Sequence, residues 1–131
     1  MKKIGTLNQP LSAVIAGMGH GDMLVIADCG LPIPEETLRI DLALTAGVPG
    51  FLETLAVIQQ ELQIEKAVIA DEMKEVSPKL YKDMLPMLGQ LEVEAVSHET
   101  FKEMTKRAVA VVRTGECTPY ANIILKSGVT F

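Results

Sequence analysis

Residues 91–112, LEVEAVSHETFKEMTKRAVAVV, predict a strand, a helix and a second strand in immediate succession. In the first six residues the two glutamates occupy alternate positions, which places them on one face of a strand. Ser97 is a favourable N-cap for a helix that continues to about Arg107. The apolar run Ala108–Val112 predicts the next strand. A strand, a helix and a strand in this order are typical of α/β proteins with parallel sheets.

The same alternation extends outward from this segment in both directions. A helix is expected to begin after Ser77, and Pro86 should stop or kink it. The remaining predicted strands are residues 23–27, 38–44, 66–70 and 122–125 with a short extension near Val129, and the remaining predicted helices are residues 7–18 and 49–62. We therefore expect an α/β fold, a single-domain three-layer αβα sandwich whose sheet is mixed but mostly parallel.

The composition fits one domain that spans residues 1–131 and excludes several classes of function. Apolar residues make up 48% of the chain and charged residues 22%, which is typical of globular rather than disordered proteins. A net charge of −5 with 4% aromatic residues and no basic block argues against nucleic-acid binding. No apolar run approaches about 18 residues, so no membrane span is expected. Residues 8–10 interrupt any signal-peptide pattern, so we expect a cytoplasmic protein.

Two further features concern self-association and the cysteines. The mean hydropathy of +0.26 is high for a small soluble monomer and predicts a homo-oligomer. Its contact surface is expected to include Ile123–Leu125 with Val129 and Phe131. Cys29 and Cys117 have the spacing of neither a zinc site nor a disulfide framework. We interpret them as two reduced thiols that serve as small apolar side chains.

His20 and Asp28 are the first candidates for a functional site. His20 lies in the glycine-rich segment Gly17–Gly21, where glycines allow the backbone to bring an imidazole into a cleft. The segment follows a helix and precedes a strand, which is the reverse of a dinucleotide-binding loop. Asp28 directly follows a predicted strand, a favoured position for ligand binding in open α/β sheets. The alternatives are an exposed histidine and an Asx turn.

A second group of candidates lies nearer the C-terminus. His98 follows another predicted strand, and Lys102 shares its helical face one turn later. Their alternative interpretation is a solvated start of a helix. The segment Arg113–Asn122 is the densest polar stretch and offers a guanidinium, a carboxylate, a phenol and an amide. Such a set suits a polyhydroxylated ligand, whereas the motifs of serine hydrolases, P-loop proteins and zinc proteases are absent.

Four motifs, in order along the chain, resemble the D-ribose pyranase family. They are Met18–Asp22, Ala27–Pro34, Ser97–Glu99 and Arg113–Asn122, which contains Arg-Thr-Gly-Glu and Thr-Pro-Tyr-Ala-Asn. The resemblance extends over the whole length of the chain. The related L-fucose mutarotases share the His-Gly-Asp element, whereas the Gly-Leu-Pro loop and the Pro-Tyr-Ala-Asn form favour the ribose branch.

The resemblance implies an isomerase that interconverts β-D-ribopyranose and β-D-ribofuranose and thereby feeds ribose catabolism. It implies that His20 is the acid/base residue and that the sugar-binding residues are Asp28, His98, Tyr120, Ala121 and Asn122, with Lys102 as a weaker addition. It also implies pentameric rings, often paired into decamers, with sites near subunit boundaries. Ring opening is proton transfer alone, so neither a cofactor nor a metal is expected.

Three alternatives remain open at this point. The first is a metal site formed by His20, Asp28 and His98 for an unrelated reaction. The second is a non-catalytic sugar-binding or regulatory module. The third is a mutarotase of the L-fucose type. Metal content and the exchange rates of the two sugars distinguish these functions.

Overall fold

A six-stranded sheet with the strand order β2-β5-β1-β6-β3-β4 forms the centre of the structure. The computed structural model describes residues 1–131. In chain order the elements are α1 (Gln9–Gly17), β1 (Met23–Ala27), β2 (Arg39–Asp41), α2 (Phe51–Gln59), β3 (Ile64–Ala70), α3 (Glu72–Val76), α4 (Pro78–Leu88), β4 (Glu92–Val96), α5 (His98–Thr105), β5 (Ala110–Arg113) and β6 (Ile123–Ser127).

The sheet is mixed, as the sequence predicts. Strand β6 runs antiparallel between β1 and β3, whereas the pairs β2–β5, β5–β1 and β3–β4 are parallel. The register places Ile26 of β1 opposite Ile123 of β6. The carboxyl end of β1 therefore lies beside the beginning of β6, and the two segments that flank these strand ends are brought together.

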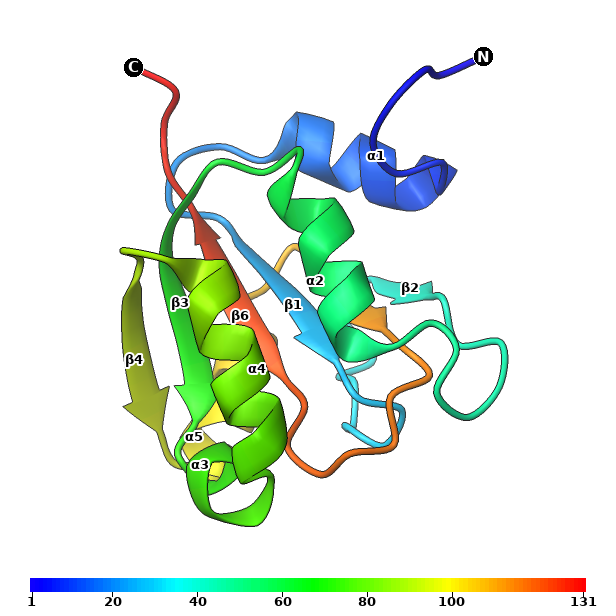
Figure 1. The fold of residues 1–131 in the computed structure, drawn as a ribbon. Coiled ribbons are helices and arrows are strands. Elements are labelled where there is room, and N and C mark those ends of the chain that lie inside the picture. The colour runs from blue at the N-terminus through cyan, green and yellow to red at the C-terminus, as the bar shows by residue number, and fades with distance from the viewer.

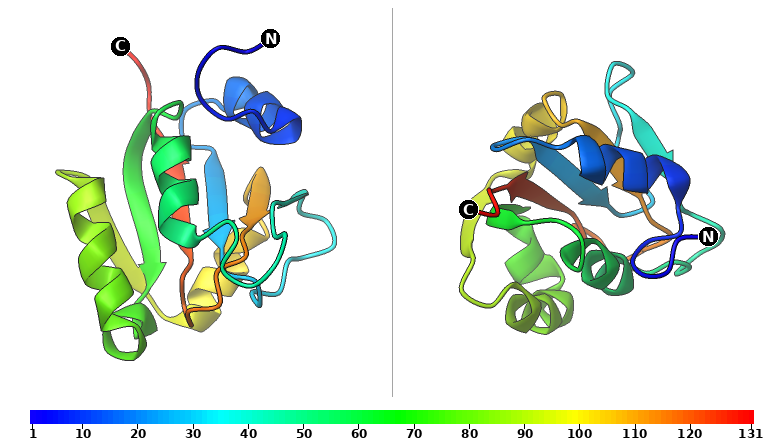
Figure 2. Two further views of the ribbon diagram at one scale, coloured as in Figure 1. Left: turned by 45° about the vertical axis from the view of Figure 1, so that its right-hand side comes forward. Right: turned by 90° about the horizontal axis from the view of Figure 1, so that it is seen from above.

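Helices cover both faces of the sheet, which confirms the αβα arrangement. Helices α2 and α4 lie in front of the sheet and α5 lies behind it (Figure 1), and the view from above shows the three layers edge-on (Figure 2). Alternate residues of β1 enter different cores because successive side chains of a strand point to opposite faces. Leu24 and Ile26 join the larger core under α2 and α4. Val25 joins the smaller core, which contains Phe101 of α5.

The predicted strand over residues 38–44 is wrong in its length. Strand β2 covers only Arg39–Asp41, and of the alternating leucine and isoleucine positions only Ile40 is buried. The cause is the partner strand, because β5 ends at Arg113, opposite Asp41. Residues after Asp41 therefore have no partner strand with which to continue the β2–β5 pairing. Leu44 is therefore exposed.

Of two predictions about helix ends, one is corrected and one is confirmed. Pro86 does not stop its helix, since α4 continues to Leu88. The missing N–H falls in the last turn, where the buried side chains of Met84 and Leu88 hold the helix against the sheet. Ser97 caps α5 as predicted, and its Oγ accepts the Thr100 N–H at 3.1 Å.

No helix combines the length and apolar character that crossing a bilayer requires.

The C-terminal residues only partly match the predicted contact surface. Ile123–Leu125 are fully buried, because they form the middle of the chain's own sheet between β1 and β3. That part of the prediction is wrong, and the chain after Ser127 forms no further strand. Phe131 is fully exposed and Val129 is partly exposed. Exposed apolar side chains also occur elsewhere, at Ile4, Leu7, Leu38, Leu44, Val48, Val57 and Val76.

Candidate functional site

Asp28 and Asn122 meet where the end of β1 lies beside the start of β6. The Asp28 backbone N–H donates to Asn122 Oδ1 at 2.8 Å, and Asn122 Nδ2 donates to Asp28 Oδ2 at 2.9 Å. Asn122 is fully buried, as is its neighbour Ala121. Two residues that are far apart in the sequence are therefore joined by a reciprocal pair of hydrogen bonds.

The Asp28 carboxylate is held in one orientation. The backbone N–H groups of Gly30 and Leu31 donate to Oδ1 at 2.9 and 2.8 Å. This arrangement is the Asx turn that the sequence left open as an alternative. A carboxylate has about four acceptor positions, and three N–H donors occupy three of them. The remaining position, on Oδ2, can accept a hydroxyl of a ligand.

His98 and Tyr120 form the aromatic part of the same site. Their rings meet edge to face with centroids 5.0 Å apart, and Phe101 lies parallel to the imidazole at 6.5 Å. Tyr120 has a φ of 60°, an uncommon conformation for a residue other than glycine. His98 Nδ1 is buried and has no hydrogen-bond partner. Such a buried polar atom is costly, so a group that could bond His98 Nδ1 would stabilise it.

Lys102 lies one turn after His98 and makes no hydrogen bond or ion pair with the other predicted residues. Its ammonium pairs with Glu99 at 2.7 Å. With the segment Pro32–Pro34 it lines a cavity of about 390 Å³ beside α5.

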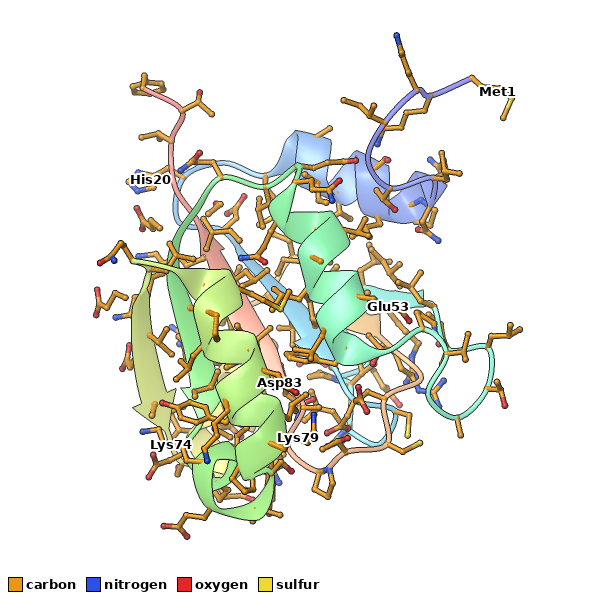
Figure 3. The ribbon with its side chains drawn as sticks, in the orientation of Figure 1. Met1, His20, Glu53, Lys74, Lys79 and Asp83 are labelled. Carbon is orange, nitrogen blue, oxygen red and sulfur yellow. The ribbon has the colours of Figure 1, made fainter.

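His20 lies at the opposite end of the sheet from Asp28. The five residues of β1 separate the two loops, a span of about 17 Å at the usual strand rise. Figure 3 shows His20 near the C-terminal segment, away from the end of β1. Within one chain His20 therefore does not meet Asp28 or His98. A metal site built from these three residues of a single chain, one of the sequence-based alternatives, is wrong.

The loop that carries His20 is firmly attached to the end of β6. The Ser127 hydroxyl donates to the Gly19 carbonyl, and the Gly21 N–H donates to the Ser127 carbonyl at 2.9 Å. Asp22 Oδ2 also accepts the Gly19 N–H at 2.8 Å. The imidazole itself is 59% exposed. A fixed loop thus presents an accessible histidine to the surroundings.

Glu65, which sequence reasoning missed, is the partner of His20. His20 Nε2 lies 2.8 Å from Glu65 Oε2, and Lys126 Nζ lies 3.3 Å from the other carboxylate oxygen. The hydrogen bond with His20, followed by the one with Lys126, holds the pKa of Glu65 below its usual value. The residue lies on β3, 45 positions after His20, and no local sequence pattern connects them.

Glu116 anchors the loop that leads to Tyr120. Its carboxylate accepts the Phe51 N–H at 3.0 Å and the Thr118 hydroxyl at 2.8 Å. Burial would raise the pKa of Glu116, but these hydrogen bonds outweigh it and hold the pKa below its usual value. Its ionised form therefore stabilises the fold at neutral pH, and this contribution is lost as the pH falls through the folded-state pKa.

Ser77 provides a second anchor for this loop. Sequence reasoning interprets Ser77 as the N-cap of α4, and it does occupy that position, but its side chain makes no capping hydrogen bond. Its hydroxyl donates instead to the Pro119 carbonyl at 2.6 Å. The N-cap pattern of the sequence gives no sign of this contact with Pro119, the residue before Tyr120.

Gly115 is needed for close packing between two loops, and its substitution by alanine should destabilise the fold. A Cβ there would lie 2.6 Å from Val48 N and closer still to backbone carbonyl oxygens. We expect Gly115→Ala to lower the free energy of unfolding by about 1–3 kcal/mol, as measured by urea denaturation. Gly17→Ala is the matched control, since nothing lies within 4 Å of its Cβ position. Equal stability of the two variants would contradict this prediction.

Comparison with known proteins gives a consistent result over the full chain. Residues 1–130 match the sequence model of the RbsD / FucU transport protein family. The chain is 60% identical to the D-ribose pyranase of Coprothermobacter proteolyticus over 131 residues, which cover all of both proteins. A structure of Bacillus subtilis RbsD complexed with D-ribose has 48% identity and a TM-score of 0.97, with both chains fully covered. The fucose mutarotase of Streptococcus pneumoniae, in complex with L-fucose, has 28% identity and a TM-score of 0.80 with the same coverage.

Proposed function

The chain belongs to the RbsD / FucU transport protein family, and we propose that it is a D-ribose pyranase that interconverts β-D-ribopyranose and β-D-ribofuranose. The observation that carries the choice of sugar is the 60% identity, over both full lengths, to a D-ribose pyranase. Identity to the fucose mutarotase is 28%. The L-fucose activity is therefore the less favoured alternative.

The proposed substrate-binding residues are the cluster at the end of β1. Asp28 Oδ2 accepts a hydrogen bond from one sugar hydroxyl. The unpartnered Nδ1 of His98 forms a hydrogen bond with a second sugar hydroxyl. Tyr120 supplies a phenol and a ring face for C–H groups of the sugar. Asn122 orients the Asp28 carboxylate, and Ala121 supports the backbone between Tyr120 and Asn122. Lys102 lies at the border of the proposed site.

The proposed reaction is reversible opening of a cyclic hemiacetal. A proton leaves the anomeric hydroxyl and another reaches the ring oxygen, which breaks the C1–O5 bond of the pyranose and forms an aldehyde. The O4 hydroxyl then attacks the aldehyde carbon and loses its proton while the carbonyl oxygen gains one, which closes the furanose with a new anomeric hydroxyl. His20 is the proposed acid/base residue, because histidine side chains ordinarily titrate at about pH 6.5 and exchange protons in both directions.

We propose that each site is completed by His20 of a neighbouring subunit. Within one chain about 17 Å of strand separates His20 from Asp28, so an acid/base role at the sugar requires a second copy. The exposed apolar side chains provide contact surface for such a homo-oligomer, a pentameric ring or two stacked rings. The enzyme would act in the cytoplasm, on ribose that has entered the cell.

Saturation-transfer NMR on equilibrating D-ribose tests the proposed activity. Catalytic amounts of the protein should accelerate exchange between the pyranose and furanose anomeric signals and leave their equilibrium ratio unchanged. L-fucose is the control sugar. Acceleration for fucose alone would support the mutarotase alternative, and ribose binding without acceleration of either sugar would support the non-catalytic binding module.

Removal of metal ions should leave the activity unchanged. The proposed reaction moves protons only and needs neither a redox change nor a Lewis acid. Ribose exchange should therefore continue at the same rate after treatment with EDTA and dialysis. A loss of activity that a divalent cation restores would contradict the prediction and favour a metal site shared between subunits.

Substitution of Glu65 by glutamine should slow turnover more than it weakens ribose binding. The variant removes the negative charge beside His20 Nε2, and we expect kcat to fall roughly tenfold with a smaller change in KM. Glu92→Gln is the matched control. Glu92 lies on the edge strand β4, where its carboxylate pairs with Lys66 of β3. Equal kinetics of both variants would exclude a positioning role for Glu65.

A further inference from the structure

Two cysteines from distant parts of the sequence meet beside the proposed sugar site. Cys29 directly follows Asp28, and Cys117 lies in the loop between β5 and β6. Their Sγ atoms are 3.6 Å apart. Both thiols are free, and Cys117 is exposed while Cys29 is half-buried. The sequence-based interpretation as small apolar side chains therefore does not describe Cys117.

Hydrogen bonds already hold together the two loops that carry the cysteines. The Cys29 N–H donates to the Glu116 carbonyl at 2.8 Å, and Arg113 Nε donates to the Cys29 carbonyl at 3.2 Å. A disulfide needs an S–S distance of about 2.05 Å. The sulfurs therefore have to approach by about 1.5 Å, which rotation of the two side chains can supply without separation of the two loops.

The two sulfurs are accessible to a small molecule. Cys29 and Cys117 line a cavity of about 280 Å³ together with Ala43–Ala46, Arg113 and Gly115. The cavity lies outside the cluster formed by Asp28, His98 and Tyr120. A small reagent can therefore reach the dithiol without entering the proposed sugar site.

We propose that Cys29 and Cys117 form a redox-active dithiol that reacts with low-molecular-weight disulfides and closes into an intramolecular disulfide. The thiolate of the exposed Cys117 attacks the small disulfide, forms a mixed disulfide and releases one small thiolate. The thiolate of Cys29 then attacks the Cys117 sulfur and releases the second. The protein dithiol loses two electrons and two protons, and the small disulfide is reduced to two thiols.

The second step should accelerate as the pH rises. In the reduced protein the hydrogen bond with Cys117, followed by burial, raises the pKa of the Cys29 thiol above its usual value. In the mixed disulfide the Cys117 thiol proton is gone, and burial is the largest cause that remains. At neutral pH little of the Cys29 thiol is therefore ionised, and the rate at which the intramolecular disulfide forms follows the thiolate fraction of Cys29.

The disulfide would stabilise the fold and leave the sugar site in place. It would link residues that lie 88 positions apart, and such a link restricts the unfolded chain strongly. The hydrogen bonds between Asp28 and Asn122 already hold the same segments together in the reduced protein. Oxidation should therefore raise the Tm without a large change in ribose exchange.

Glutathione disulfide is the probe for the test, and its readouts do not depend on the proposed function. After incubation at pH 8, mass spectrometry of the wild-type chain should show a loss of two hydrogen atoms and no lasting adduct. Cys29→Ser should retain one glutathione on Cys117, because no second thiol is present to displace it. The Tm of the oxidised wild type should rise by roughly 5–15 °C and return after dithiothreitol, whereas neither Cys29→Ser nor Cys117→Ser should show this rise.

Four outcomes would overturn the proposal. They are wild-type thiols that both remain free, a persistent mixed disulfide on the wild type, disulfides between subunits, and a closed form with a lower Tm than the reduced form. The first three exclude the intramolecular reaction. The fourth shows that closure strains the loops instead of joining them.

Discussion

Substitution of His20 by alanine is expected to lower the rate of pyranose–furanose exchange by roughly 10²-fold or more. Loss of a general acid/base group costs a factor of about 10²–10⁴, and His20 is the only histidine in the loop between α1 and β1. Saturation-transfer NMR gives the rate, and ribose affinity should change less because the proposed binding residues around Asp28 remain intact.

The variant should fold and assemble as the wild type does. His20 is 59% exposed, and its side chain contacts only the surface carboxylate of Glu65. Circular dichroism and light scattering should therefore give unchanged spectra and mass. A His20→Ala protein with full exchange activity would refute the assignment of the acid/base role.

Much of the fold is predictable because its elements are regular and their ends carry local signals. Strand β4, helix α5 and strand β5 follow from alternating polarity, an N-cap serine and an apolar run, all within residues 91–112. The length of β2 is not predictable in this way, because it depends on where the partner strand β5 ends. The short helix α3, at Glu72–Val76, has too few residues for a helical period to be recognised.

The residues of the site are predictable, but their distribution in space is not. Asp28 and Asn122 lie at neighbouring strand ends, and the structure joins them through two hydrogen bonds. His20 is as noticeable in the sequence as Asp28, yet β1 separates the two loops. The contacts of Glu65 with His20 and of Ser77 with Pro119 are not predictable, because the partners are remote in sequence. Such contacts follow from the sheet order and not from any local pattern.

The separation of His20 from the proposed sugar-binding cluster leads to the second large prediction. Two inactive variants should restore activity to each other when they assemble into the same oligomer. In His20→Ala the cluster around Asp28 is intact, and in Asn122→Ala the histidine is intact. Asn122→Ala alone should bind ribose weakly, because Asp28 loses the Nδ2 donor that orients its carboxylate.

Random assembly of equal amounts of the two variants places an intact His20 beside an intact Asn122 in about a quarter of the sites. The mixture, refolded together, should therefore exchange ribose at about a quarter of the wild-type rate per site, whereas variants mixed after separate assembly should remain inactive. His20→Ala refolded with His20→Ala is the matched control. If both residues served the same site from one chain, every site in the mixture would lack one of them, and no activity would return. The measurement thus decides whether the geometry of the single chain, in which β1 keeps His20 and Asp28 apart, is also the reason that the enzyme must assemble.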